Sequence, residues 1–432
     1  MDLNKMDAAV FLKTITPSIN QLGRQVSLMN FLLMASLFVY GQRSGNPQEA
    51  SVKQPAVLWT YSSGAAIISS PVIDNGLVYF GSEDSTWYAL ESATGKVKWK
   101  LRTNAPIRSS PVISGDRIFL TGGNGVLACA NKATGAIVWR IVFDQTALFM
   151  AERSYDFADY YHSSPTIDDG VIYLGTGNSV LAAYRTETGE LIWRYPTGDI
   201  IHCRPVLVGD KVIIGSFDGY IHAVNKNTGN PVWKFKTVGH QYFPKGEVQG
   251  ILASDGQRVF VGARDYNFYA IDANAGTAVW NRKFDNGWAM SATVSDTVVY
   301  IGTSDDRVMV AADTRSGREY WRTDVKFNIF GGAAIVSDQI IVGTIWGKTY
   351  ALEQKTGKIK WSFDTQGFRA NHLKYFTGQD QFRSDIGSIL RTPFAWIAAE
   401  RRMGGIFSTP AINGGLVILT STEGKVYGLK TN

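Results

Sequence analysis

Eight tryptophans recur at a spacing close to 40 residues, and this repeat constrains the fold more than any other feature of the chain. Seven of the eight follow a glycine by four residues, as Trp99 follows Gly95. A fixed period of this length is typical of repeat architectures, in which each unit buries its faces against its neighbours. The eight residues are Trp59, Trp99, Trp139, Trp193, Trp233, Trp280, Trp321 and Trp361.

Each repeat contains four short strand-like runs. In the first complete unit they cover residues 69–74, 76–82, 86–92 and 96–102, and the turns between them are rich in Asp, Asn, Ser, Thr and Gly. Such turns favour β-hairpins. The runs are apolar on both sides, as expected of sheets that are covered on both faces. Four strands in each unit of about 40 residues predict propeller blades.

Counting the units predicts an all-β, eight-bladed β-propeller over residues 57–432. Seven units are complete, whereas the eighth begins at Thr409 and the chain stops before another tryptophan. We expect residues 57–61, which include Trp59, to supply the missing outer strand and close the ring, because closure protects exposed sheet edges. Each indole is expected to dock on a neighbouring blade, with a glycine allowing close approach.

The first 41 residues have the pattern of an export signal. Lys13 and Arg24 precede an apolar run of 15 residues, 26–40, which is shorter than the about 20 residues of a membrane-spanning helix. Val39 and Gly41 favour cleavage before Gln42. An uncleaved anchor is the alternative. Residues 42–56 are interpreted as a flexible leader, so we expect an exported protein with no transmembrane segment in its mature form.

Charge and cysteine content argue against several classes of protein. The formal net charge is +6, and no run of Lys and Arg forms a nucleic-acid footprint. The two cysteines, Cys129 and Cys203, provide neither a disulfide framework nor metal-ligand spacing. The chain also lacks a nucleophile-elbow motif and a phosphate-binding loop. No catalytic residue and no metal ligand is predicted.

The blade signature, S-P-V-x-x-x-G-x-V-Y-x-G-S followed by Y-A-L-x-x-x-T-G-x-x-x-W, resembles the pyrroloquinoline quinone (PQQ) repeat propellers of the quinoprotein alcohol dehydrogenase-like superfamily. The resemblance covers residues 57 to the end. It implies an eight-bladed ring with tryptophan docking between blades. In size and repeat the chain is most similar to the propeller lipoprotein of the outer-membrane β-barrel assembly machinery, although it lacks that protein's acylated cysteine.

The same family includes quinoprotein dehydrogenases that hold PQQ and calcium. Those enzymes carry an adjacent pair of cysteines at the cofactor, whereas Cys129 and Cys203 are far apart here. The resemblance therefore transfers no catalytic residue. We predict no cofactor and favour a non-catalytic scaffold in the periplasm or at the outer membrane or cell surface. A PQQ-dependent alcohol or sugar dehydrogenase is the alternative, and a sugar- or polymer-binding module is a third hypothesis.

Three insertions, at 142–162, 236–248 and 362–405, each follow a predicted fourth strand and should share one face of the ring. The third ends in a predicted helix that begins after Thr392 and ends at Gly404. We predict that this face binds a protein or an extended chain. The residues of the helix proposed to bind it are Phe394, Trp396 and Ile397. Packing of the helix on its own propeller is the alternative.

Residues that precede the innermost strands should ring the mouth of the central channel. Two arginines, two histidines and one phenylalanine are the candidates for binding an anionic ligand there, a quinone carboxylate included. Bonding to water and strand ends is the alternative interpretation. The five residues are Arg108, His162, His202, Arg204 and Phe407.

Overall fold

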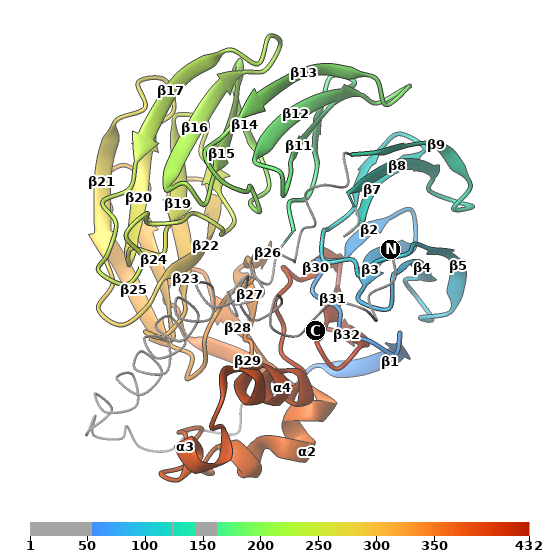
Figure 1. Ribbon diagram of the computed structural model, residues 1–432. Helices are drawn as coiled ribbons and strands as arrows, with labels where there is room; N and C mark the ends of the chain where they lie inside the picture. Colours follow the sequence, from blue (N-terminus) through green and yellow to red (C-terminus); the bar gives the residue numbers. More distant parts are fainter. Residues whose placement is uncertain (1–53, 123–124, 144–161, 432) are drawn as a thin grey trace, which may run out of the picture.

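The computed structural model describes residues 54–122, 125–143 and 162–431, and most of its regular structure is β-strand (Figure 1). Eight four-stranded antiparallel sheets stand as blades around a common axis, which confirms the predicted eight-bladed propeller. The first strand of a blade lies nearest the axis and the fourth lies on the perimeter. Residues 1–53, which include the predicted signal segment and most of the leader, lie outside the described residues.

The first four blades follow one another along the chain from blade 1 to blade 4. Their strands are β2 (Val72–Asp74), β3 (Leu77–Ser82), β4 (Thr86–Glu91) and β5 (Val97–Arg102); β6 (Val112–Ser114), β7 (Arg117–Gly122), β8 (Val126–Asn131) and β9 (Ile137–Val142); β10 (Thr166–Asp168), β11 (Val171–Gly175), β12 (Val180–Arg185) and β13 (Leu191–Pro196); and β14 (Val206–Val208), β15 (Lys211–Gly215), β16 (Tyr220–Asn225) and β17 (Pro231–Lys236).

Blades 5 to 7 continue in the same order, and blade 8 combines strands from both ends of the chain. Their strands are β18 (Ala253–Ser254), β19 (Arg258–Gly262), β20 (Asn267–Asp272) and β21 (Ala278–Lys283); β22 (Ala289–Ser295), β23 (Val298–Thr303), β24 (Val308–Asp313) and β25 (Glu319–Asp324); β26 (Ala334–Val336), β27 (Gln339–Gly343), β28 (Lys348–Glu353) and β29 (Ile359–Asp364); and β30 (Ala411–Asn413), β31 (Leu416–Thr420), β32 (Lys425–Lys430) and β1 (Ala56–Ser62).

The ring closes through β1, which pairs antiparallel with β32 as the outer strand of blade 8. The register runs from Ala56 opposite Lys430 to Ser62 opposite Lys425, with an irregularity just before Trp59. Trp59 is 9% exposed and belongs to a buried apolar layer between blades 8 and 1, together with side chains of both blades. The N-terminal strand therefore joins the two ends of the chain in one sheet, as predicted.

Each repeated tryptophan packs on the next blade rather than on its own turn. An added Cβ at Gly95 would lie 2.5 Å from the Trp59 ring, and one at Gly135 would lie 2.8 Å from the Trp99 ring. These glycines have positive φ, so they serve both the turn and the contact. The Nε1–H of Trp59 donates to Ser92 O of blade 1 at 2.9 Å. The next six tryptophans donate in the same way to backbone oxygens of the following blade.

Trp361 departs from this pattern because blade 8 has no turn between its third and fourth strands. Its Nε1–H donates instead to the side-chain oxygen Oε1 of Gln339, in its own blade, at 3.0 Å. The junction between blades 7 and 8 thus replaces a repeated backbone contact with a side-chain contact.

The third insertion contains three helices in its described residues, where the sequence predicted one. These are α2 (Gln366–Tyr375), α3 (Ile386–Ile389) and α4 (Pro393–Met403). The predicted helix is α4, whose N-cap Thr392 accepts a hydrogen bond from the N–H of Ala395 and whose C-cap Gly404 is left-handed. Helix α2, which Thr365 caps, was not predicted because its sequence is only weakly amphipathic and has no acidic residue in the first turn.

Candidate functional site

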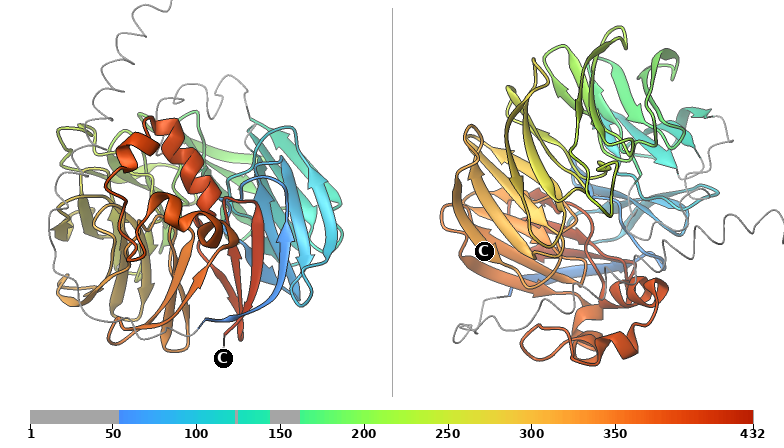
Figure 2. Two further views of the ribbon diagram at one scale, coloured as in Figure 1. Left: turned by 90° about the horizontal axis from the view of Figure 1, so that it is seen from below. Right: turned by 60° about the vertical axis from the view of Figure 1, so that its left-hand side comes forward.

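The turn between the two middle strands of a blade and the segment that leaves its fourth strand lie on one face of the ring, which we call the insertion face. Backbone hydrogen bonds join them: Thr103 N–H donates to Ser85 O at 2.7 Å, and Thr237 N–H donates to Gly219 O at 3.0 Å. The segments after β17 and β29 therefore share this face, and helices α2–α4 lie on one side of the ring (Figure 2). Residues 144–161 of the first predicted insertion lie outside the described residues.

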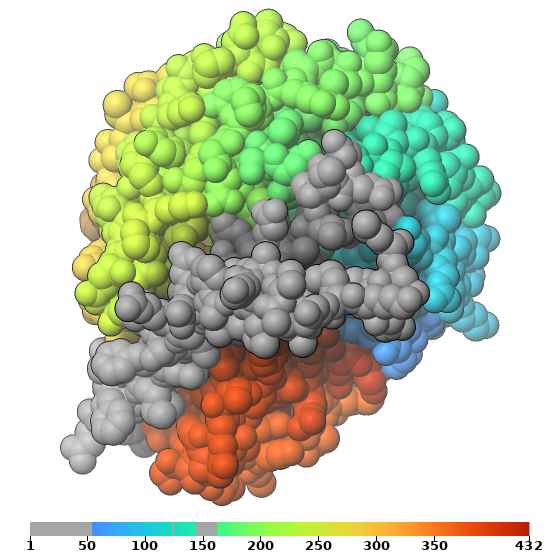
Figure 3. All heavy atoms as spheres, viewed as in Figure 1, coloured from blue at the N-terminus to red at the C-terminus, as the bar shows by residue number. Residues whose placement is uncertain are grey.

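An aromatic cluster centred on Trp346 holds the third insertion on the ring. Trp346 lies in the turn between β27 and β28 and is 2% exposed. Its ring centroid is 5.0 Å from that of Phe376, 5.4 Å from Phe382 and 6.0 Å from Trp396, all edge to face. Aromatic pairs of this kind contribute about 0.5–1.5 kcal/mol beyond the burial of their area. The helices form a lobe packed on the propeller (orange-red in Figure 3).

Helix α4 turns one side to the propeller and another to solvent. Ala399 and Met403 are buried, and Trp396 belongs to the Trp346 cluster. Phe394, in the first turn, is 68% exposed. Of the three residues predicted to bind a partner, Phe394 is therefore the most exposed, whereas Trp396 and Ile397 are partly buried. The helix does pack on its own propeller, and it still presents an apolar side chain to solvent.

A carboxylate of blade 1 binds an arginine of α4 and connects this helix to the blade that follows blade 8 in the ring. Glu83, in the turn between β3 and β4, accepts a hydrogen bond from Nε of Arg108 at 2.8 Å. Its other oxygen lies 2.8 Å from Nη1 of Arg401, near the end of α4. The side chains of Glu83 and Arg108 are 9% and 11% exposed. Arg108, a predicted channel-mouth residue, is therefore neutralised by Glu83.

A second polar cluster joins α2 to blade 7. Nε2 of His372 lies 2.7 Å from one carboxylate oxygen of Asp380, and Nζ of Lys348 lies 3.1 Å from the other. The His372 ring stacks on Phe368 with centroids 4.6 Å apart. Burial raises the pKa of the nearby Asp364 carboxyl, and the charge of Lys348 opposes this rise. These contacts connect α2 and the segment that follows it to blade 7.

The second insertion is held by an arginine that stacks on aromatic rings. Arg264 is 3% exposed, and its guanidinium carbon lies 5.0 Å from the centroid of Phe217, 4.9 Å from Trp288 and 5.7 Å from Phe243 of the insertion. Phe243 and Trp288 also meet edge to face at 5.0 Å. Such cation–π contacts are strongest when the pair is desolvated. Val238, at the start of this insertion, is 73% exposed.

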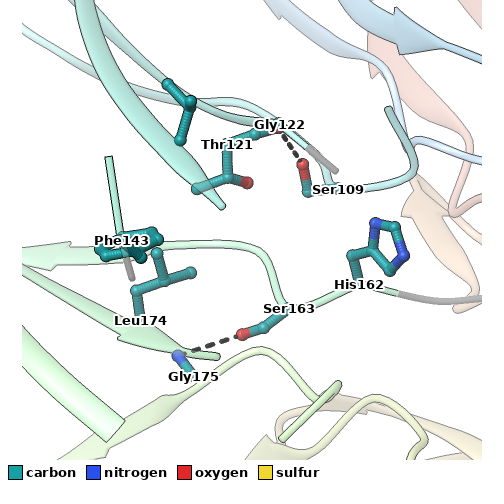
Figure 4. Close-up of a pocket in the computed structure, with 9 residues that line it drawn as sticks. Ser109, Thr121, Gly122, Phe143, His162, Ser163, Leu174 and Gly175 are labelled. Carbon is teal, nitrogen blue, oxygen red and sulfur yellow. Dashed lines mark hydrogen bonds between the residues drawn. The ribbon is translucent and has the colours of Figure 1, made fainter. Parts of the chain in front are cut away.

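The two histidines predicted at the channel mouth are neighbours. The ring centroids of His162 and His202 are 5.8 Å apart, and His202 also meets Phe217 edge to face at 5.3 Å. Both histidines are buried. His162 stands beside a small hollow between blades 2 and 3, whose lining includes Ser109 and Ser163 (Figure 4).

The other two predicted channel-mouth residues have different surroundings. Phe407 is buried against Phe330, with ring centroids 5.8 Å apart. Arg204 is exposed, and its Nε donates to Oγ1 of Thr166 at 3.2 Å. Arg108 binds Glu83, so its charge is paired, whereas Arg204 bonds a neutral hydroxyl.

Acidic residues in the turn between the two middle strands of a blade bind the side chain four residues farther along the chain. Asp218 accepts from the N–H groups of Gly198 and Tyr220, and its Oδ2 lies 3.0 Å from Nε2 of His222. Burial alone would raise the pKa of Asp218, but the hydrogen bonds and charge of His222 outweigh it and lower the pKa to about 2. Asp305 shows the opposite balance, because burial raises the pKa of its carboxyl. Both residues are explained by turn structure.

A model of the family of outer membrane protein assembly factor BamB matches residues 36–112, 104–234, 217–376 and 310–432 of this chain. These matches together cover nearly the whole propeller. The chain belongs to the BamB family.

Solved structures agree with this assignment at the level of the fold. BamB from Moraxella catarrhalis superposes with a TM-score of 0.65 at 14% identity, over 87% of this chain and 100% of that one. The computationally designed protein Ika8 superposes equally well, with a TM-score of 0.65 at 13% identity over 88% and 100% of the two chains. Since a designed protein shares this BamB-like fold, the fold alone assigns no function.

Local similarity extends to a redox enzyme. Quinohemoprotein alcohol dehydrogenase ADH IIB of Pseudomonas putida is 38% identical over 94 residues, which are 19% of this chain and 14% of the enzyme. The match therefore spans a small part of the enzyme's length, as expected when shared blade repeats carry it.

No group of three or more His, Cys, Asp or Glu side chains in ranges 54–122, 125–143 and 162–431 is placed to hold a metal ion. Cys129 lies in β8 of blade 2 and Cys203 precedes β14 of blade 4. Burial raises the pKa of the Cys203 thiol to about 12, and its sulfur bonds the backbone of Gly215.

Sequence reasoning missed Glu83, Arg264 and Trp346, the residues that fix the insertions. Each lies in a turn between middle strands, one or two residues past the Gly-Ser, Gly-Ala or Gly-Thr pair that ends the second strand. The available signal was a departure from the repeat: Glu83 and Arg264 stand where blades 2 and 3 have glycine, and Trp346 stands where the other blades have Asp, Asn or Glu. No helix in the part of the chain that the structure describes is long and apolar enough to cross a membrane.

Proposed function

We propose that this BamB-family protein is a non-catalytic, exported scaffold that binds a protein or an extended polypeptide through its insertion face. The observation that carries the proposal is the fixed presentation of apolar side chains. The third insertion is anchored by the Trp346 cluster and by Glu83, and yet Phe394 and Leu373 are 68% and 66% exposed. Apolar side chains on loops with a rigid support are typical of protein-binding surfaces.

The name of the family supports the proposal that the partner is a component of outer-membrane protein assembly. The rigid support also matters energetically, because a surface that is already ordered loses little conformational freedom when a partner binds. Both insertions that the structure describes are fixed in this way, so the whole face is prepared for contact.

Site-specific photo-crosslinking in cells tests the proposal. A photoreactive phenylalanine at Phe394 should crosslink to envelope polypeptides, whereas the same group at Ala133, in the exposed turn between β8 and β9 on the opposite face, should not. Phe394→Asp should weaken recovery of the same partner without lowering the melting temperature. Identical crosslinks at both positions would refute binding through the insertion face.

The quinoprotein alternative has its own measurement. Titration of the purified chain with PQQ, with and without calcium, would be followed by quenching of tryptophan fluorescence. We expect PQQ to cause no saturable quenching of the protein's tryptophan fluorescence. Saturable, calcium-dependent quenching would replace the scaffold proposal with that of a PQQ-dependent dehydrogenase.

A further inference from the structure

Four consecutive blades share a belt of hydroxyl groups at the start of their innermost strands. The backbone N–H of Thr409 donates to Oγ of Ser70, that of Ser70 to Oγ of Ser110, and that of Ser110 to Oγ of Ser164, each at 2.9 Å. Each of these serine oxygens accepts a hydrogen bond from a backbone N–H of the preceding blade. Among the described residues, none of the three serine hydroxyls donates to a protein group in return. The belt therefore presents O–H donors near the axis.

Arg204 stands at the next position of the belt, in blade 4, where the three preceding blades have serine. Its Nε is oriented by Oγ1 of Thr166 in blade 3, and that hydroxyl in turn donates to the backbone O of Pro205 at 2.6 Å. In the described part of the chain no carboxylate lies within ion-pair distance of Arg204, in contrast to Arg108 with Glu83 at 2.8 Å.

Solvent reaches Arg204 although protein surrounds it. The residue is exposed, and yet desolvation by the surrounding atoms lowers the pKa of its guanidinium. Because Arg204 lies two residues before β14, the innermost strand of blade 4, this partly desolvated cation stands at the axial end of the blade. A charge in such a place is screened less by water than one on the outer surface, so an anion there is bound more strongly.

We propose that this belt binds a small oxyanion through the guanidinium of Arg204 and the hydroxyl group of the adjacent Ser164. A guanidinium offers a planar fork of N–H donors that matches two oxygens of a phosphate, sulfate or carboxylate. A neighbouring hydroxyl without an acceptor of its own adds a further donor. The belt lies at the insertion-face end of the innermost strands, because the segments that leave the fourth strands lead into it, but anion binding there does not depend on the function proposed above.

Calorimetric titration of the purified protein tests the site, with inorganic phosphate in one arm and acetate in the other, at constant ionic strength. Arg204→Ser introduces the residue that blades 1 to 3 have at this position, so the ring should remain folded. It should weaken phosphate binding roughly 10- to 100-fold, the loss expected for a charge-assisted contact. Arg194→Ser is the matched control, because Arg194 is exposed on the outer strand β13, and it should leave the affinity unchanged.

Two further variants keep the proposal testable if Arg204→Ser unfolds. Arg204→Lys keeps the charge and loses the fork, so phosphate affinity should fall. Ser164→Ala should lower it by a smaller factor. Tighter binding of phosphate than acetate assigns the site to tetrahedral oxyanions, and equal binding assigns it to carboxylates as well. No saturable heat with either anion, or equal affinities in Arg204→Ser and Arg194→Ser, would overturn the proposal.

Discussion

Replacing Trp59 with alanine tests whether the N-terminal strand closes the ring as firmly as the other blades are joined. The indole is 9% exposed, packs on Gly95 of blade 1 and donates to Ser92 O at 2.9 Å. Removing a buried tryptophan costs about 3–5 kcal/mol, because burial is lost and a cavity remains. This is a large share of the about 5–15 kcal/mol by which proteins are stable. Trp59→Ala should therefore lower the unfolding midpoint strongly.

Equilibrium unfolding in guanidinium chloride, followed by circular dichroism, measures the loss. Leu58→Ala is the control on the same strand, since Leu58 is 51% exposed and its truncation should change stability by less than about 0.5 kcal/mol. Trp193→Ala removes the equivalent contact between blades 3 and 4 and should cost a similar amount. If Trp59→Ala and Leu58→Ala unfold at the same midpoint, β1 contributes no closure and the reasoning is refuted.

Three further changes test the polar contacts. Glu83→Gln should destabilise the protein by about 3 kcal/mol in the same assay, because it leaves Arg108, whose side chain is only 11% exposed, without its counter-charge; a change below about 0.5 kcal/mol would contradict this. Asp218→Asn should lower the free energy of unfolding by about 2 kcal/mol at pH 7, because Asp218, with a folded pKa of about 2, stabilises the fold above pH 4. The difference between variant and parent should shrink as the pH falls towards 2. Asp305→Asn should raise the melting temperature at pH 7, because the raised pKa of Asp305 makes its ionised form unfavourable. The gain should vanish below about pH 4. An equal difference in melting temperature between variant and parent at pH 7 and below pH 4 would exclude this.

The repeat made the ring predictable because a propeller encodes the same local chemistry eight times. The spacing of Trp59 from the next tryptophan and the unfinished last unit sufficed to predict closure by β1. Helix α4 was predictable because Thr392 and Gly404 are local end signals. In contrast, Glu83 and Arg401 are 318 residues apart in sequence, and no local pattern predicts their ion pair. The different partners of Arg108 and Arg204 likewise depend on which neighbours compete for each guanidinium.

Because β1 pairs with β32, the ring can close only after the whole propeller has been synthesised. The first strand of the ring to be synthesised has its partner in the last one, so it must wait, with one apolar side uncovered, until the rest of the chain has been made. A chain interrupted anywhere before β32 leaves blade 8 without its third strand and β1 without a partner. Proteases that cut exposed strands can therefore distinguish interrupted products from intact ones, even when seven blades have already formed.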